Sequence, residues 1–328
     1  MEAYLPASQV VVAVVLAALV LVLFAGGALA QRGPVAASRV ASWTLLFAGT
    51  AGVERLTVAE PAGFRMLALI AFAMLSAKCI VVAEERANGM EPLPFRRWLG
   101  FAGAWLGMQP RLFARPRRRA LPGARALLAR GAAHLTLGIA LVLGARLAWI
   151  STHSRLLATL LVLPGLSLAL HFGLCNLLAG TWRMLGVACD ALFRAPLRST
   201  SLSEFWGRRW NLAFSEMTGI AVYRPLSVSV RLGRGPALFA SFLLSGLLHE
   251  MAISLPVHAG FGLPLLYFAL QGALVTAERA RTRAGRPVST TAGRTWTLVC
   301  LVLPLPMLFH RPFLAGVVWP LIGIEPGS

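Results

Sequence analysis

The stretch that decides the fold is Ser201–Asn211, which reads SLSEFWGRRWN, and it is followed in a later apolar run by Ser245–Glu250, which reads SGLLHE. These two blocks hold most of the polar residues that could perform chemistry, whereas the sequence around them consists of long apolar segments. A charged, aromatic loop therefore leads into a histidine that lies inside an apolar run. We expect the chemistry of the chain to lie between Ser201 and Glu250.

The composition surrounding these blocks is that of a membrane protein. Of 328 residues, 57% are hydrophobic and 13% charged, and the mean hydropathy is +0.72, whereas soluble domains carry roughly 25% charged residues. We predict an all-α, polytopic integral membrane protein in which residues 1–328 form a single membrane-embedded domain. The signature region of that domain is expected at about 192–255. No internal repeat or soluble domain is evident.

The net charge of +19 has two interpretations. In a soluble chain it would suggest nucleic acid as a partner. Here nearly every cation is an arginine between apolar segments, and loop arginines that orient membrane helices account for the same excess. We therefore predict no nucleic-acid partner and contact with membrane lipid, with the oligomeric state left open.

The apolar runs predict about eight spans, because each is close to the length that crosses a hydrocarbon core of about 30 Å. The first is expected to be a retained helix and not a cleaved signal, since no lysine or arginine precedes it. The second is weak because Glu54 and Arg55 shorten it. The predicted spans are 8–30, 41–53, 66–83, 126–150, 156–184, 236–255, 261–277 and 296–309, with a short apolar tail at 313–324.

Arginine-rich loops alternate with arginine-poor ones, and positive loops face the cytoplasm. The rich loops are 32–39, 84–125, 183–234 and 279–294. This alternation requires the weak second run to cross the membrane, and it places the N-terminus outside and the loop 183–234 in the cytoplasm. If the source is bacterial, the membrane is the cell membrane. The segment 95–113, which mixes aromatic residues with arginines, is expected to be an interfacial helix or a short re-entrant element.

No metal or disulfide site is expected from the cysteines. Cys79, Cys175, Cys189 and Cys300 form no C-x-x-C pair and lie in or beside apolar segments. His171 precedes Cys175 by four residues, but two ligands do not make a metal site.

His249 is the first candidate for catalysis. It lies about thirteen residues into its predicted span, which at 1.5 Å per residue places it roughly 20 Å from the cytoplasmic end. Ser241 and Ser245 precede it by eight and four residues, so all three share one helix face. Glu250 lies about 100° further round the helix and cannot simply orient its neighbour. A structural histidine that bonds a neighbouring helix is the simpler alternative, but two adjacent ionisable groups in a span usually mark a cavity or pathway.

The preceding loop supplies the other candidates. Asn211 can donate and accept hydrogen bonds without charge, Arg208 and Arg209 can bind phosphate, and Trp206 and Trp210 suit the headgroup level of a bilayer. The alternative is an aromatic and basic interfacial belt with no role in chemistry.

The residues SLSEFWGRRWNL, the later Tyr223-Arg224-Pro225 and the block SGLLHE stand in an order that resembles the membrane-bound O-acyltransferase (MBOAT) superfamily, specifically its wax-synthase-like branch. The resemblance implies an MBOAT-like fold and transfer of an acyl chain from coenzyme A to a hydroxyl group. It implies a membrane-buried histidine, His249, and a polar loop residue, Asn211, as catalytic residues. No bound cofactor is implied, and acyl-CoA is a co-substrate. The N-terminal part departs from the family pattern, which leaves the acceptor open.

The residue types agree with this chemistry. A histidine can take the proton of an alcohol as it attacks a thioester, and Asn211 could hold the developing oxyanion. Ser245 and Glu250 are expected to line the substrate site beside these residues. A covalent acyl-enzyme is less favoured because no complete triad is evident.

We therefore predict an acyl-CoA-dependent O-acyltransferase acting on a lipophilic alcohol, with a long-chain alcohol, and so a wax ester, as the default. One alternative is the same fold acylating a sterol, a glycerolipid or a secondary metabolite. Another is a proton-coupled membrane transporter that uses His249 and Glu250 as a relay. A purely structural membrane subunit would leave these two residues without a role.

Overall fold

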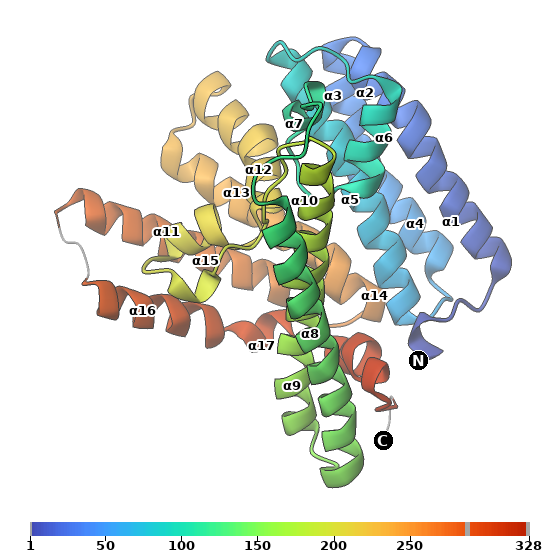
Figure 1. Cartoon of the computed structure of the whole chain (residues 1–328), viewed down its shortest axis with the longest axis vertical. Helices are drawn as coiled ribbons and strands as arrows, with labels where there is room; N and C mark the ends of the chain where they lie inside the picture. Colours follow the sequence, from blue (N-terminus) through green and yellow to red (C-terminus); the bar gives the residue numbers. More distant parts are fainter. Residues whose placement is uncertain (1, 286–288, 326–328) are drawn as a thin grey trace.

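The structure is a computed structural model that describes residues 2–285 and 289–325. Over these residues every regular element is helical and none is a β-strand, so the predicted all-α fold is confirmed (Figure 1). The α-helices are α1 (Gln9–Leu21), α2 (Gly27–Arg32), α3 (Val35–Thr44), α4 (Thr50–Thr57), α5 (Ala62–Ala87), α6 (Phe95–Ala104), α7 (Arg111–Ala114), α8 (Ala124–Thr152), α9 (Arg155–Ser167), α10 (Cys175–Met184), α11 (Leu202–Glu204), α12 (Leu212–Thr218), α13 (Arg234–His249), α14 (Leu255–Val257), α15 (Leu263–Arg283), α16 (Thr290–Val302), α17 (Leu305–Leu308) and α18 (Arg311–Phe313).

Short turns with π-helical or 3-10 geometry join or extend many of these helices. The π-helical turns are Val22–Gly26, Leu45–Gly49, Leu168–Leu174, Phe205–Arg209, Gly219–Tyr223, Pro225–Ser229, Glu250–Ser254 and Leu314–Val318, and the 3-10 turns are Glu2–Tyr4, Pro196–Arg198 and Trp319–Ile322. Such π turns inside helices occur frequently at functional sites, and the signature region carries four of them.

Within the described residues, six helical stretches are long and apolar enough to cross a membrane, and each coincides with a predicted span. They are Gln9–Arg32, Ala62–Ala87, Ala124–Thr152, Arg155–Met184, Arg234–Val257 and Thr290–Leu308. The predicted run 41–53 lies within continuous helix from α3 to α4, and the run 261–277 lies in α15, but neither is among the six. The count of about eight spans therefore stays a prediction.

α5 is the central helix of the N-terminal half, and it packs against α2, α3 and α4. It buries charged side chains that find partners on other segments. The Arg65 guanidinium donates to the Pro256 carbonyl oxygen at 2.7 Å and pairs with Glu54. The Lys78 ammonium donates to the Gly107 carbonyl oxygen. Each buried cation thus has partners among protein atoms, which offsets the cost of burial away from water, although the Arg65 Nε atom is buried without a hydrogen-bond partner among the described residues.

The aromatic segment 95–113 forms α6 and α7, but its rings turn towards protein. Trp98, Phe101 and Trp105 are no more than 3% exposed, and the Trp98 indole nitrogen donates to the Leu23 carbonyl oxygen at 2.8 Å. Phe101 also lies beneath the Lys78 ammonium, 4.0 Å from the ring centroid. The segment that was expected to be interfacial therefore packs against the helix bundle, with Phe101 covering the buried Lys78 ammonium of α5.

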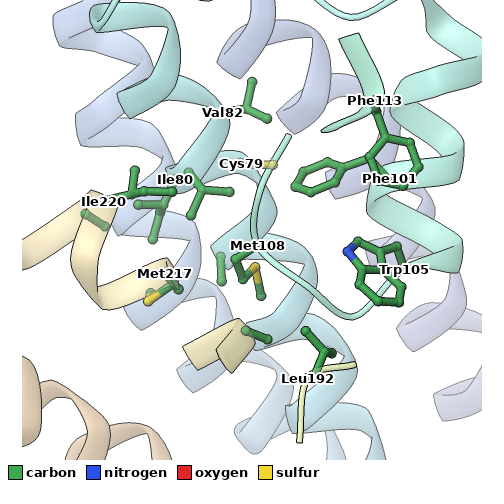
Figure 2. Packing of buried hydrophobic residues seen from close by; sticks show 14 of the residues in the cluster. Cys79, Ile80, Val82, Phe101, Trp105, Met108, Phe113, Leu192, Met217 and Ile220 are labelled. Carbon is green, nitrogen blue, oxygen red and sulfur yellow. The ribbon is translucent and has the colours of Figure 1, made fainter. Parts of the chain in front are cut away.

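One cluster of buried hydrophobic residues connects the helices around α5 to the signature region. Figure 2 shows Ile80 of α5 beside Met217 and Ile220 of the signature region, with Met108 between these residues and the aromatic segment. The cluster includes Ala213 and Met217 of α12 and thus helps to hold this helix in place.

α8 and α9 form a long antiparallel hairpin whose tip projects beyond the other helices (Figure 1). Glycines allow the two backbones to approach closely, as is typical of helix packing in membranes. A Cβ atom on Gly138 would meet the Gly165 carbonyl oxygen at 2.6 Å, and one on Gly173 would meet Leu135 backbone atoms. The outward faces carry exposed leucines and isoleucines, which suit contact with lipid.

The alternation of positive loops predicts the outcome of cysteine labelling. All four native cysteines are buried, so an impermeant thiol reagent applied to intact cells reports on introduced, exposed positions. We expect no labelling of Arg118→Cys, Arg208→Cys or Arg283→Cys until the membrane is opened, and efficient labelling of Glu2→Cys. Labelling of position 283 from outside would overturn the orientation.

Candidate active site

A cavity of about 560 Å³ lies within the signature region and the helices around it. Its walls come from the π turn Leu168–Leu174, the segment 203–223, α13, α15 and the end of α17. Most of the predicted site residues reach it. His249, Asn211, Trp206, Trp210, Ser245 and Ser241 line the cavity, whereas Arg208, Arg209 and Glu250 do not.

His249 is the last residue of α13, immediately before the π turn Glu250–Ser254. Its Nδ1 atom lies 2.7 Å from the Ser245 carbonyl oxygen, one helical turn earlier. Because a carbonyl oxygen only accepts, this contact assigns the ring proton of a neutral imidazole to Nδ1 and leaves the lone pair on Nε2. The ring also packs against Phe268, with centroids 4.2 Å apart. His249 is therefore oriented by its own helix and by α15, and its Nε2 atom has no hydrogen-bond partner among the described residues.

Asn211 lies at the sharp turn that follows the π turn Phe205–Arg209. Its φ of 45° is left-handed, a conformation in which asparagine is enriched. Its Oδ1 atom accepts from the Phe214 backbone N–H at 3.3 Å and so caps α12. No partner of its amide nitrogen is found among residues 2–285 and 289–325. The side chain is thus fixed through its oxygen atom.

Backbone hydrogen bonds fix the loop that carries Asn211. The Trp210 N–H donates to the Phe205 carbonyl oxygen at 2.8 Å, and the Leu212 N–H donates to the Leu192 carbonyl oxygen at 2.9 Å. The Ser215 hydroxyl donates to the Trp206 carbonyl oxygen at 2.6 Å. The FWGRRWN block therefore folds as one compact turn and not as a mobile loop.

Trp206 and Trp210 form walls of the cavity. The Trp206 indole nitrogen donates to the buried Gln271 side chain at 3.2 Å. Trp210 stacks on Phe205, with the ring planes 13° apart. Both tryptophans are thus positioned by internal contacts, which is a different role from the headgroup-level belt considered from the sequence.

The two signature arginines are placed differently from each other. The Arg209 guanidinium forms an ion pair with Glu204 at 2.6 Å and faces the carbonyl oxygens of Arg194 and Ala195. The Thr200 backbone N–H and the Arg209 guanidinium hold the pKa of Glu204 below its usual range, so this carboxylate stays charged at neutral pH. Arg208 is exposed, next to the cavity-lining Gly207.

Ser245 and Glu250 were both expected at the substrate site, but only Ser245 lines the cavity. Ser241 and Ser245 are buried and line the cavity on the same face of α13 as His249, as the spacing predicts. The Glu250 carboxylate instead accepts from the Leu265 backbone N–H at 3.0 Å, near the start of α15. Its second oxygen is buried without a hydrogen-bond partner among the described residues.

Residues outside the two sequence blocks also reach the cavity. Arg279 of α15 lines it and donates from Nε to the Ser203 hydroxyl at 3.1 Å. His171 lines it from another helix, with Nδ1 3.2 Å from the Ser167 hydroxyl and its ring stacked on Phe193. In the sequence, His171 was noted only for its four-residue spacing from Cys175, and two ligands were too few to predict a metal site. In the part of the chain that the structure describes, no group of three His, Cys, Asp or Glu side chains could hold a metal ion.

Over the described residues the chain is all-helical, with six stretches able to cross a membrane, and a known family matches the segment that supplies much of the cavity wall. Residues 189–269 match the membrane-bound O-acyl transferase family. The match extends past the predicted 192–255 to include Phe268, the ring that packs on His249. The resemblance to the MBOAT superfamily is thereby confirmed.

Named relatives identify the wax-synthase-like branch. The chain is 42% identical over 71 residues to "Probable long-chain-alcohol O-fatty-acyltransferase 6" of Arabidopsis thaliana, which is 20% of each chain. It is 38% identical over 73 residues to "Long-chain-alcohol O-fatty-acyltransferase" of Simmondsia chinensis, which is 20% of this chain and 21% of the relative. It is 33% identical over 109 residues to "Acyl-CoA--sterol O-acyltransferase 1" of Arabidopsis thaliana, which is 30% of this chain and 31% of the relative. The chain thus spans about a fifth to a third of the length of these relatives.

Proposed function

We propose that this protein is an acyl-CoA-dependent O-acyltransferase that esterifies a lipophilic alcohol, with a long-chain alcohol as the acceptor. One observation carries the proposal: a single cavity contains the His249 imidazole and the Asn211 carboxamide, and neither Nε2 of the imidazole nor the amide nitrogen has a hydrogen-bond partner among the described residues. The names of the relatives support the reaction class, and they include both long-chain-alcohol and sterol acyltransferases. A sterol is therefore the second candidate acceptor.

The proposed reaction is a direct transfer. Nε2 of His249 takes the hydroxyl proton as the alcohol oxygen attacks the thioester carbonyl carbon. The amide N–H of Asn211 stabilises the oxyanion that forms on the carbonyl oxygen. Collapse of this intermediate breaks the carbon–sulfur bond, and the imidazolium returns its proton to the departing thiolate. The products are an ester and free coenzyme A, and the imidazole is regenerated in its starting form.

The walls of the cavity suit the two substrates. Ile253, Leu308 and Phe309 provide an apolar region beside His249 that fits alkyl chains. Arg279 and Ser203 supply a polar region elsewhere on the wall. Coenzyme A carries phosphate groups that cannot enter hydrocarbon, so its charged part requires such a region. We therefore place the nucleotide near Arg279 and the thioester between Asn211 and His249.

The proposal is tested by mass spectrometry of lipids from cells with and without the protein. A wax ester that depends on the protein and disappears in the His249→Ala variant is the expected result. A sterol ester with the same dependence would select the second acceptor. Solute uptake driven by an ion gradient, without any new ester, would instead favour a proton-coupled transporter and reject acyl transfer.

The position of Arg279 predicts a donor-specific defect. In Arg279→Gln we expect acyl-CoA affinity to fall by about 1.5–3 kcal/mol, the scale of a hydrogen bond to a charged group. Affinity for the matching acyl-pantetheine, which lacks the nucleotide phosphates, should be unchanged. Arg283→Gln, on the same helix but outside the cavity wall, is the matched control. An equal loss for both donors would remove Arg279 from phosphate binding.

Arg208 and Arg209 were also predicted to bind donor phosphate, and we retain this as an expected result. Changing either to Gln should weaken acyl-CoA binding by about 1.5–3 kcal/mol and hardly alter the affinity for the alcohol. Because Arg209 pairs with Glu204 inside the signature turn, its variant should also give a lower yield of folded protein. The measurement is donor affinity on purified, monodisperse protein, and normal affinity in both variants would exclude them.

A further inference from the structure

The segment 111–130 contains a cluster of arginines that the proposed reaction does not use. Seven arginines and no aspartate or glutamate occur within these residues. Arg111 is paired with Glu85, and Arg130 donates to a carbonyl oxygen of its own helix. The remaining members are exposed, and no partner of their guanidinium groups is found among the described residues. These members, which we call the arginine platform, are Arg115, Arg117, Arg118, Arg119 and Arg125.

The platform is held in a fixed shape, although it lies in a loop. The Arg117 backbone N–H donates to the Gly186 carbonyl oxygen at 2.8 Å, and the Leu121 N–H donates to the Arg183 carbonyl oxygen at 2.9 Å. The Arg183 guanidinium in turn donates to the Pro122 carbonyl oxygen at 2.8 Å. Gly186 has a φ of 82°, and its Cα lies too close to Arg117 to carry a side chain. A loop whose only role was to carry positive charge would not need these contacts.

A hollow of about 430 Å³ lies beside the platform, where α8 begins. Arg125 is the one charged residue in its wall. The other lining residues are small or apolar: Ala120, Leu121, Pro122, Gly123, Ala124, Ala126 and Met184. α8 is among the helices able to cross a membrane, so the hollow lies at the end of a spanning helix. It shares no lining residue with the cavity around His249.

We propose that the arginine platform and this hollow form a binding site for one anionic phospholipid of the surrounding bilayer. The phosphate of the headgroup pairs with the platform, where guanidinium groups match phosphate oxygens in bidentate fashion. The glycerol and the first part of an acyl chain occupy the hollow, whose lining side chains are all apolar except Arg125. Clusters of four to eight basic residues at the end of a membrane helix suit anionic lipid. A soluble anion would gain nothing from the apolar wall.

The test is native mass spectrometry of the full-length protein released from nanodiscs that contain phosphatidylcholine with increasing phosphatidylglycerol. We expect the wild type to retain one phosphatidylglycerol molecule. The triple variant Arg117→Gln, Arg118→Gln, Arg119→Gln should bind it on the order of a hundredfold more weakly, because each basic residue near an anionic lipid surface contributes roughly fivefold. Ala126→Phe, which fills the hollow but keeps every charge, should weaken retention at least tenfold.

Two controls distinguish a specific lipid-binding site from a general effect of positive surface charge. The triple variant Arg198→Gln, Arg283→Gln, Arg294→Gln removes the same number of exposed arginines elsewhere, and it should retain the lipid as the wild type does. Glycerol phosphate, the headgroup without chains, should not compete for the site. The proposal would be overturned if the control triple variant lost the lipid as strongly as the platform variant does. It would also be overturned if Ala126→Phe retained the lipid normally, or if glycerol phosphate competed fully for the site.

Discussion

His249→Ala should lower the turnover of acyl transfer by about 10²–10⁴, the range expected when a positioned general base is removed. The reason lies in the bond from Nδ1 to the Ser245 carbonyl oxygen at 2.7 Å, which leaves Nε2 as the proton acceptor. Affinity for acyl-CoA should stay close to normal, because the imidazole acts on the hydroxyl and not on the donor. Single-turnover kinetics on purified protein measures the rate of acyl transfer and the affinity for acyl-CoA separately.

A second histidine provides the matched control. His134 lies in α8, inside a candidate span but outside the cavity wall, so His134→Ala removes an imidazole from the membrane region without touching the proposed reaction. Its turnover should equal that of the wild type. Near-normal turnover in His249→Ala would reject the general-base mechanism, whatever the control shows.

Asn211→Asp should lower turnover by about 10²–10³, as expected for the loss of one oxyanion donor. The substitution isolates the amide N–H groups. Aspartate keeps the oxygen that accepts from the Phe214 N–H and is itself a favoured N-cap residue, so α12 should remain folded. It removes both N–H donors and brings a negative charge to the place where an oxyanion forms.

Asn211→Gly provides the comparison. Glycine tolerates the left-handed φ of 45° but loses both the cap and the donor, so its turnover should fall without the added charge repulsion. Thermal unfolding of each variant checks that the fold is kept. Full activity in Asn211→Asp would show that the amide does not contact the reacting carbonyl.

The sequence predicted the local parts of this site and missed the parts that depend on tertiary packing. The four-residue and eight-residue spacings placed Ser245 and Ser241 on the face of His249, because helix periodicity is a local property. Glu250 was expected at the substrate site, but its direction depended on where α15 begins, and its carboxylate accepts from Leu265 there. Arg279 reaches the cavity from a helix far along the chain, and no local pattern signalled this.

The predictions of the fold divide in the same way, between local features that were predicted and packing-dependent features that were not. Long apolar runs predicted about eight spans, and six of these runs coincide with helical stretches that are able to span a membrane within the described residues, since length and hydropathy are local. The segment with Trp98 and Phe101 was expected at the membrane interface because its composition is amphipathic. The rings are buried against protein, and Phe101 covers the Lys78 ammonium of α5, a contact that is visible only when the helices are assembled.

The charged residues buried in α5 have a consequence for the order in which the chain can enter the membrane. A cation inside a bilayer costs roughly 2.5–3.5 kcal/mol on insertion scales, so α5 alone is a poor transmembrane segment despite its apolar character. The carbonyl that satisfies Lys78 belongs to Gly107, and one that satisfies Arg65 belongs to Pro256, 191 residues later. Glu54 is available to Arg65 as soon as α5 is made, but the carbonyl partners of this guanidinium are synthesised only after His249, so α5 acquires its full set of polar contacts late in synthesis.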